Sequence, residues 1–497
     1  MTAPLKPGQA EFRELAKLGN LIPVFTEVIA DAETPVSAFQ KIDGGGYSFL
    51  FESAEKNDLL GRYSFVGSQP RFTFESRGRN IRISENGETR EFETAEDPLH
   101  EIETLMKRFT LVPSPALSEC RFSGGAVGYL GYDMVRFFEP SIAPHPDDQL
   151  DLPESFFFLA ETVLIFDHRT RRLRIVANAF VEGDPDAAYA KAAARIEALV
   201  EKLAQPARLP PIFVDRDPPA IVPEANTTRD EYMQMVRDGM EFIRAGDIFQ
   251  FVPSQRFETS FDGDPLTLYR SLRFVNPSPY MFCLKFAGAF ALVGSSPEVH
   301  VRAIDGRIDI RPIAGTRRRG ANAAEDEANA ADLIGDPKER AEHLMLVDLA
   351  RNDVGRVAKF ASVRVSDFMT IEKYSHVMHI VSNVSGELRP DRSAYDVMRA
   401  TFPAGTVSGS PKVRAMQIIN QFEKSKRGVY AGAVGYFGFD GNSDSCIALR
   451  TVVLKNGKAF VQAGAGIVAD SSPEAEHQEC VNKAMGMMAA IARAKSV

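Results

Sequence analysis

Two pairs of glutamates have a spacing that could bind a metal ion. Glu339 and Glu342 lie three residues apart, and Glu476 and Glu479 repeat this spacing near the end of the chain. Residues three apart on a helix project from one face. Four such carboxylates in a partly buried site would raise one another's pKa values, and a divalent cation would remove that repulsion. Hard oxygen ligands are typical of Mg²⁺, although most glutamate pairs at this spacing are simply solvated helix faces.

Both pairs fall in segments with the pattern of packed helices. The segment 339–357 contains the apolar run LMLVDLA, and the segment 473–494 contains AMGMMAAIA. Ser472 suits the N-cap of the second helix, and Pro473 suits its first position. Further helices are expected at 184–203, 228–246 and 391–402.

Alternating and short apolar runs predict strands between these helices. They lie at 79–85, 162–167, 248–258, 280–286 and 290–296. Hairpin-like runs with interspersed helices favour an α+β fold with antiparallel sheets over a strict βαβ array.

The clearest boundary is a connector that contains six prolines. Proline fixes φ and removes a backbone donor, so this stretch is expected to be extended. It divides the chain into an N-terminal part (1–204), the connector (205–228) and a C-terminal part (229–497).

Two distant segments repeat one pattern. Residues 124–133 read GGAVGYLGYD, residues 431–440 read AGAVGYFGFD, and seven of the ten positions are identical. A glycine-rich strand can recur by chance. The alternative is that the two parts contribute equivalent strands to a pseudo-symmetric pair of sheets, in which the glycines permit close backbone approach.

Composition narrows the class of protein. The net charge of −9 gives no electrostatic reason to bind nucleic acid or an anionic membrane. No apolar stretch reaches membrane-spanning length, and the first residues lack the apolar core of a signal peptide. The four cysteines form no CxxC pair, which fits a reducing compartment. A cytoplasmic protein is expected.

Several long motifs, in order, resemble those of the chorismate-utilising enzymes. They are RPIAGTRRRG (311–320), DPKERAEHLMLVDLARNDVGRV (336–357), TFPAGTVSGSPK (401–412), VYAGAVGYFGFDG (429–441), CIALRT (446–451) and AGAGIVADSSPEAEHQECVNKA (463–484). The resemblance covers roughly residues 225–490 and continues more weakly in LFESAE (50–55) and GRYSFVG (61–67). It implies two stacked antiparallel β-sheets flanked by helices, with chorismate bound in a cleft.

The resemblance also implies ligands for a Mg²⁺ ion and for chorismate. Glu342 and Glu479 match direct metal ligands, while Glu339 and Glu476 match carboxylates that act through bound water. A metal that holds the ring carboxylate would neutralise charge and polarise the ring. Residues matching the substrate site are Ala314, Gly315, Thr316, Tyr430, Arg450, Gly464, Gly466 and Lys483. Among them, Tyr430 and Arg450 match the pair that holds the enolpyruvyl carboxylate.

The implied chemistry replaces the C4 hydroxyl of chorismate while a nucleophile enters at C2. Hydroxide is a poor leaving group, so a protonated acid must lie beside it, and Glu298 matches that residue. Thr406 matches a polar residue of the cleft. His379 matches a histidine of the second step, the elimination of pyruvate. Without the resemblance, a lone histidine in an apolar strand is more often a satisfied core residue.

Two positions distinguish sister reactions within the family. Relatives that add water to chorismate use a lysine base where Gln250 stands, and an amide cannot deprotonate water. Aminodeoxychorismate synthases often carry a lysine at the position of Ala314. The resemblance therefore implies a lyase that converts chorismate and ammonia into anthranilate and pyruvate through 2-amino-2-deoxyisochorismate, the first committed step of tryptophan biosynthesis. The alternatives are an aminodeoxychorismate synthase component and a non-catalytic tryptophan-binding regulatory protein.

Other motifs imply feedback inhibition and a partner subunit. NPSPYMF (276–282) and FES (51–53) resemble the tryptophan feedback site of anthranilate-forming relatives, although Phe51 replaces the usual leucine. The matching residues are Glu52, Ser53, Pro279, Tyr280, Met281, Val434 and Tyr436. No cysteine lies in a glycine-flanked nucleophile turn, so glutamine-derived ammonia would require a separate glutamine amidotransferase subunit, in a heterotetramer.

Overall fold

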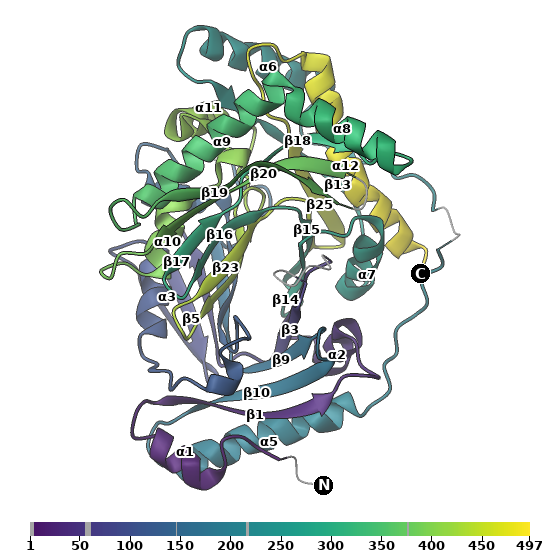
Figure 1. The fold of residues 1–497 in the computed structure, drawn as a ribbon. Helices are drawn as coiled ribbons and strands as arrows, with labels where there is room; N and C mark the ends of the chain where they lie inside the picture. Colours follow the sequence, from purple (N-terminus) through teal and green to yellow (C-terminus); the bar gives the residue numbers. More distant parts are fainter. Residues whose placement is uncertain (1–3, 55–60, 146, 215–217, 375–376) are drawn as a thin grey trace.

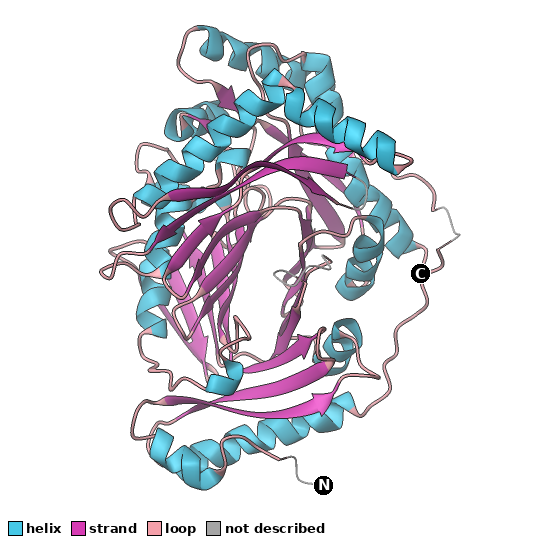
Figure 2. Cartoon of the chain, viewed as in Figure 1, coloured by secondary structure: helices cyan, strands magenta, loops and turns pink. Residues whose placement is uncertain are grey.

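Two large antiparallel sheets face each other, with helices on their outer sides (Figure 1, Figure 2). The computed structural model describes residues 4–54, 61–145, 147–214, 218–374 and 377–497. One core cluster, rich in phenylalanine, lies between the sheets, and two others lie between each sheet and its helices. This arrangement confirms the expected α+β fold with two stacked antiparallel β-sheets flanked by helices.

The first sheet contains strands from both ends of the chain. In spatial order they are β1 (Leu21–Ile29), β10 (Arg172–Phe180), β9 (Thr162–Asp167), β3 (Tyr63–Ser68), β2 (Tyr47–Glu52), β14 (Tyr280–Phe286), β15 (Phe290–Ser296), β24 (Thr451–Lys455), β25 (Lys458–Gly464), β13 (Ser254–Ser260) and β11 (Glu224–Ala225). The strands that precede the connector join those that follow it where β2 pairs with β14.

The second sheet is organised in the same way. Its order is β18 (Ile313–Arg318), β20 (Val377–Glu387), β17 (Arg307–Ile310), β16 (Val299–Ile304), β23 (Ser443–Ile447), β22 (Ala433–Gly438), β7 (Gly125–Leu130), β8 (Ser155–Ala160), β4 (Phe72–Arg77), β5 (Asn80–Glu85) and β6 (Glu88–Glu93), and β19 (Arg364–Lys373) pairs with β20. A separate two-stranded ladder joins β12 (Gln250–Phe251) to β21 (Gly409–Ser410). Both sheets thus combine the N-terminal and C-terminal parts, and the division of functions between the parts stays a prediction.

Amphipathic helices cover the outer faces. Those packed on the first sheet are α1 (Gln9–Leu15), α2 (Pro35–Ile42), α5 (Pro185–Leu203), α6 (Arg229–Arg244), α7 (Pro265–Val275), α11 (Lys412–Phe422) and α12 (Pro473–Lys495). Those packed on the second are α3 (Pro98–Met106), α4 (Val135–Phe138), α9 (Pro337–Gly355) and α10 (Ala394–Thr401). The helix α8 (Ala323–Gly335) packs on β18 and β20, and short 3₁₀ turns form at η1 (Pro115–Leu117), η2 (Tyr132–Met134) and η3 (Gly405–Val407).

The repeated segments form neighbouring strands of one sheet. This corrects the expectation of equivalent strands in two sheets, because β7 and β22 pair antiparallel with Gly128 opposite Gly435. A local two-fold relation results: Tyr129 pairs with Phe156 of β8, as Tyr436 pairs with Asp444 of β23. A Cβ on either glycine would collide with the carbonyl oxygen of the outer neighbouring strand. The glycines therefore permit close strand packing.

Most predicted elements lie within a few residues of their expected bounds. The expected helix 391–402 begins later, because Ser393 forms a capping box with Asp396. Ser472 occupies the N-cap of α12, but its side chain makes no capping bond there. The expected strand 248–258 was wrong as one element: it breaks between β12 and β13 at Pro253, which has no N–H to donate to a ladder.

Candidate active site

The structure brings all predicted catalytic, substrate and metal residues around one cleft of about 700 Å³. Strands β18, β20 and β25 and the N-terminal turns of α9 and α12 supply much of its walls, and Gln250 of β12, the loop after β15 and the segment before β24 complete it. The predicted residues that line it are Gln250, Glu298, Ala314, Gly315, Thr316, Glu339, Glu342, His379, Thr406, Tyr430, Arg450, Gly464, Gly466, Glu476, Glu479 and Lys483.

Glu298 has the environment of an acid that holds its proton. It follows β15 and is 6% exposed. Burial raises the pKa of its carboxyl to about 8, while a 2.7 Å hydrogen bond from the Thr406 hydroxyl opposes that rise. Among the described residues, no charged side chain contributes to the shift. The carboxyl is therefore largely protonated at neutral pH, which general acid catalysis requires.

His379 lies in the cleft wall on β20, not in the apolar core. Its Nδ1 lies 2.7 Å from the carbonyl oxygen of Gly315 and 3.2 Å from the Thr316 hydroxyl. Donation from Nδ1 to the carbonyl leaves Nε2 as the unprotonated nitrogen. Burial lowers the pKa of the imidazole, which keeps the ring neutral and able to accept a proton.

Arg450 is a half-buried cation that has no carboxylate partner among the described residues. There, the only hydrogen bond from its guanidinium is a 3.3 Å bond to the Asn276 amide oxygen. Burial lowers the pKa of its guanidinium, so the uncompensated charge is costly. Tyr430, which is 7% exposed, lies in the same cleft. An anionic ligand would relieve the cost of burying Arg450.

Each of the four glutamates has its own partner in this structure. Gln250 donates to Glu342 at 3.0 Å and Arg317 donates to Glu339 at 3.1 Å. On α12, Ser471 donates to Glu476 at 2.7 Å and Lys483 contacts Glu479 at 2.8 Å. Across the described ranges, no three carboxylate, histidine or cysteine side chains lie close enough to share one metal ion.

The donor set nevertheless has the chemistry that a hard dication requires. Burial raises the pKa of Glu342, and repulsion from Glu339 and Glu479 adds to the rise. Burial also raises the pKa of Glu476, with Glu479 again repelling. A divalent cation between the two helices would favour the ionised state of all four carboxylates.

Gln250 and the glycines shape the wall next to these glutamates. A Cβ at Gly466 would lie 2.9 Å from the Gln250 amide nitrogen, so only glycine leaves the amide in place. The two lysines of the cleft wall are both engaged by carboxylates, Lys483 by Glu479 and Lys338 by Asp470.

A second cavity, the inter-sheet cavity, has a volume of about 190 Å³. It lies where β2 and β14 of the first sheet face β16, β22 and β23 of the second. All residues predicted to bind tryptophan line it: Glu52, Ser53, Pro279, Tyr280, Met281, Val434 and Tyr436. Pro279 also lines the cleft, so the segment 276–279 forms a wall shared by both cavities.

Sequence reasoning indicated Glu52 and Tyr280 at the inter-sheet cavity but missed their polar partners. Asp444 accepts 2.8 Å and 3.2 Å hydrogen bonds from the Tyr280 hydroxyl and the Arg302 guanidinium. Glu52 accepts a 2.5 Å hydrogen bond from Tyr269 and a 3.3 Å bond from Arg273. Strand pairing brings Arg302 to Asp444, whereas Tyr280 contacts Asp444 from the other sheet, and Tyr269 and Arg273 contact Glu52 from α7. No local spacing in the sequence could have indicated these contacts.

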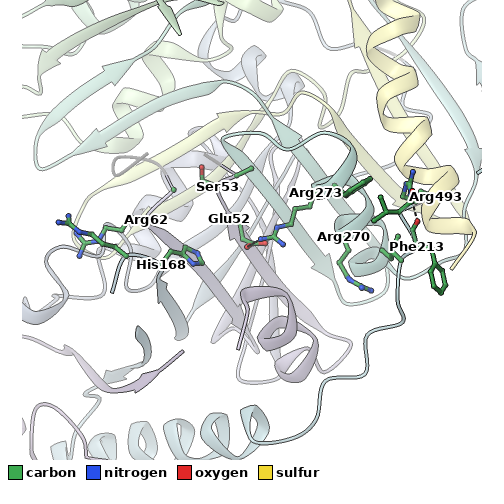
Figure 3. A pocket seen from close by; sticks show the side chains of 14 residues that line it. Glu52, Ser53, Arg62, His168, Phe213, Arg270, Arg273 and Arg493 are labelled. Carbon is green, nitrogen blue, oxygen red and sulfur yellow. Dashed lines mark hydrogen bonds and ion pairs between the residues drawn. The ribbon is translucent and has the colours of Figure 1, made fainter. Parts of the chain in front are cut away.

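A third cavity, of about 850 Å³, borders the inter-sheet cavity through Glu52, Ser53 and Arg62. Figure 3 shows Arg273 directed toward Glu52, with Arg270 and Arg493 further along. Arg270 and Arg493 donate to backbone carbonyls of the connector, at Pro210 and at 213–214. Arg270 therefore fastens the connector to α7, and Arg493 fastens it to α12.

The chain matches one protein family along most of its length. The sequence profile of the family described as chorismate binding enzyme matches residues 48–489. The chain belongs to that family, which confirms the resemblance found in its motifs. Among the described residues, no helix is long and apolar enough to span a bilayer.

Relatives place the chain more narrowly. It is 48% identical to anthranilate synthase component 1 of Aquifex aeolicus over 97% of each chain. It is 45% identical to the protein of that name from Acetivibrio thermocellus over 99% of each chain. The crystal structure of anthranilate synthase component I from Streptococcus pneumoniae superposes with a TM-score of 0.76, at 37% identity, covering 93% of this chain and 99% of the other.

Proposed function

We propose that this chain is a lyase that converts chorismate and ammonia into anthranilate, pyruvate and water. Its similarity to proteins named anthranilate synthase component 1 extends over nearly the whole chain. One observation carries the proposal: a single cleft holds Glu298, which is protonated at neutral pH, and Arg450, a cation without a carboxylate partner among the described residues. A dicarboxylate whose hydroxyl must depart as water requires both.

The first step is amination. The Glu298 carboxyl gives its proton to the C4 hydroxyl, the C4–O bond breaks, and water leaves. Ammonia supplies the electron pair of the new C2–N bond, and Glu298 remains as a carboxylate. Thr406 donates to that carboxylate and stabilises the product of the proton transfer. The planar guanidinium of Arg450 and the Tyr430 hydroxyl hold the enolpyruvyl carboxylate.

The second step is elimination from 2-amino-2-deoxyisochorismate. His379 takes the proton from C2, the C3–O bond breaks, and the ring becomes aromatic. The departing enolpyruvate takes up a proton and becomes pyruvate. The bond from Nδ1 to the Gly315 carbonyl fixes the imidazole tautomer, so that Nε2 is the basic nitrogen.

We propose Mg²⁺ as the cofactor, held by the four glutamates of α9 and α12. Glu342 and Glu479 would bind it directly, and Glu339 and Glu476 through water. Bound there, it would neutralise the ring carboxylate of chorismate and withdraw electrons from the ring.

Neighbouring reactions of the family are disfavoured by the cleft itself. Gln250 donates its amide to Glu342, so this side chain is no base for the addition of water. Ala314 offers no nucleophile, and the two cleft lysines are held in ion pairs. Free ammonia is therefore the nucleophile that the site accommodates.

Three further assignments rest on the resemblance and the relatives' name. A separate glutaminase subunit would supply ammonia from glutamine, within a heterotetramer. L-Tryptophan would bind the inter-sheet cavity as a feedback inhibitor. The enzyme would act in the cytoplasm, in keeping with its four free, buried cysteines.

The test is incubation of the purified chain with chorismate, Mg²⁺ and ammonium at mildly alkaline pH. Anthranilate fluorescence should appear together with equimolar pyruvate. Glutamine should replace ammonium only after a glutaminase subunit is added. Formation of isochorismate or 4-amino-4-deoxychorismate would contradict the proposal.

A second experiment separates the two steps. His379→Met removes the base but leaves Glu298 in place, so chorismate should still be consumed. Chromatography of the quenched mixture should show the aminated intermediate, with anthranilate formation slowed by about 10²–10⁴-fold. Normal anthranilate formation by this variant would remove His379 from the mechanism.

A further inference from the structure

Behind the cleft lies an arginine that no motif singled out. Arg427 follows α11, and its side chain is 2% exposed. It forms a bidentate pair with Glu423, with Nε–Oε2 at 2.9 Å and Nη2–Oε1 at 2.6 Å. A buried ion pair is weak evidence for stability, because desolvation of both charges offsets much of their attraction. The remaining donors of Arg427 indicate a different use.

Those donors bind two loops of the cleft wall. Nη1 donates to the Val407 carbonyl at 2.8 Å, and Nη2 donates to the Val252 carbonyl at 2.6 Å. Val407 directly follows Thr406, whose hydroxyl binds Glu298. Val252 directly follows β12, which carries Gln250. The Arg427 guanidinium thus connects the loop that carries Thr406 to strand β12, which carries Gln250.

Two aromatic rings lie against the guanidinium of Arg427. Its carbon lies 5.4 Å from the ring centroid of Tyr430 and 4.6 Å from that of Tyr132. Tyr430 lines the cleft, whereas Tyr132 belongs to η2 in the N-terminal part. Contact with two rings, combined with hydrogen bonds from Nε, Nη1 and Nη2, suits a planar guanidinium, and lysine has no such group.

Glu423 extends the same network to a further wall. Its Oε1 accepts hydrogen bonds from the Ser254 N–H at 2.8 Å and the Ser254 hydroxyl at 2.7 Å. The Ser254 hydroxyl in turn accepts from Gln462, at 2.9 Å, and Gln462 lines the cleft. The pair therefore contacts, directly or through one residue, four separate segments of the wall.

We propose that Arg427 is a positioning residue for the proposed reaction, fixing the Thr406 loop, the Gln250 strand and Tyr430 in one geometry. Arg427 itself does not line the cleft. Its effect on the chemistry passes through Thr406 to Glu298 and through Tyr430 to the substrate carboxylate. This inference rests on the proposed function, which assigns those roles.

The test is Arg427→Lys, which keeps the positive charge but removes the planar guanidinium group. The turnover number with saturating ammonia should fall roughly ten- to a hundredfold, the scale of an ångström-sized displacement in a catalytic site. The informative readout is the alkaline limb of the pH profile of kcat/KM for chorismate. Thr406 stabilises ionised Glu298, so loosening its loop should raise the pKa of the acid and move that limb to higher pH.

Other titratable groups near Glu298 do not produce the same shift. His300 and Asp353 lie on its far side, around a small cavity of about 30 Å³. Burial lowers the pKa of His300 to about 3, and Asp353 is paired with Lys412 at 2.7 Å. Neither side chain contacts Arg427, so Arg427→Lys leaves their states unchanged.

Arg136→Lys provides a matched control. Arg136 also forms a largely buried pair, with Glu154 at 2.5 Å, but neither residue lines the cleft. Both variants should lower the melting temperature, and only Arg427→Lys should move the alkaline limb of the pH profile of kcat/KM. If Arg427→Lys fails to fold, Tyr132→Leu, which removes one stacking ring, should move the limb in the same direction by less.

The outcomes are distinguishable. A lower melting temperature with an unchanged pH profile and turnover in Arg427→Lys would show that the pair is only structural and would overturn the inference. An unchanged profile in Tyr132→Leu, when that variant is the one that folds, would do the same. Absence of anthranilate formation by the unaltered enzyme would instead contradict the proposed function.

Discussion

The cleft and the inter-sheet cavity are both lined by Pro279, but their charged side chains differ in the partners they have. Among the described residues, the cleft's Glu298 has only a hydroxyl as side-chain partner, and its Arg450 has only an amide. In the inter-sheet cavity, Asp444 is bound by Arg302 and Tyr280, and Glu52 is bound by Tyr269 and Arg273. Glu298 and Arg450 thus lack an oppositely charged partner among these residues, whereas both carboxylates at the inter-sheet cavity have one.

The local two-fold relation explains how the inter-sheet cavity becomes hollow. Asp444 and Cys446 occupy the positions that correspond to Phe156 and Phe158 at the other end of the paired strands. There the two phenylalanines pack with Phe286, whose ring lies 4.9 Å from that of Phe156. The backbone frame is nearly the same at both ends. Side-chain volume therefore decides which end can take a ligand.

Glu298→Gln should have the largest effect and should act on the cleft alone. An amide is too weak an acid to protonate the departing hydroxyl, so chorismate consumption should slow by about 10²–10⁴-fold. Tryptophan affinity, measured by calorimetry, should remain that of the unaltered protein. Loss of tryptophan binding in this variant would show that the two sites are not electrostatically separate.

Glu342→Gln should have the next largest effect. Removing one of four carboxylates weakens the attraction for a dication, and turnover should fall by about a thousandfold, equivalent to roughly 4 kcal/mol. Calorimetry should show weaker Mg²⁺ binding, independently of turnover. The control is Asp348→Asn, on the exposed side of the same helix, which pairs only with Arg351. Equal Mg²⁺ affinity in the unaltered protein, Glu342→Gln and Asp348→Asn would show that Glu342 does not bind the metal.

Cys446→Phe should fill the inter-sheet cavity in the way that Phe158 fills its counterpart. Inhibition by tryptophan should weaken by roughly tenfold or more, because an occupied cavity offers no apolar surface for an aromatic ring. The assay is anthranilate formation at increasing tryptophan concentration. Phe158→Cys is the reverse control: it should cost about 3 kcal/mol of unfolding free energy and leave inhibition intact. Full inhibition of Cys446→Phe would place the inhibitor elsewhere.

The smallest expected effect is a pH dependence. Glu298 must be protonated to act, and its pKa is about 8, so kcat/KM should fall as the pH rises through about 8. The pKa of His379 lies below its usual range, so loss of the base should appear only at lower pH. Rates must be expressed per concentration of free ammonia, which itself rises with pH. A limb near the ordinary glutamate pKa would contradict the buried acid.

Local patterns in the sequence were sufficient for the elements that carry the carboxylates. The i, i+3 spacing with apolar runs predicted α9 and α12, because a helix repeats every 3.6 residues and shows its faces in sequence. Motif resemblance then indicated a set of residues that the structure brings around one cleft. The roles of those residues remain predictions.

Contacts between residues far apart in the sequence could not be predicted from such local patterns. The contacts of Arg427 with Val252 and Val407, and of Arg302 with Asp444, depend on which strands and loops become neighbours. The repeat was visible, yet the partnership of its two copies in one sheet was not, since identical strands can pair or lie apart. Strand register is a tertiary property, and one residue of slip would exchange the faces.

The pairing of β7 with β22, and of β2 with β14, has a consequence for synthesis on the ribosome. The N-terminal part completes two half-sheets whose open edges are β2 and β7, and their partners are translated only later. At roughly 5–20 residues per second, the delay before β14 emerges is about 4–20 seconds. During that interval the nascent chain exposes two unpaired strand edges, which another copy of the same half could fill. The yield of correctly assembled protein then depends on whether translation supplies the missing strands faster than the exposed edges pair with another chain.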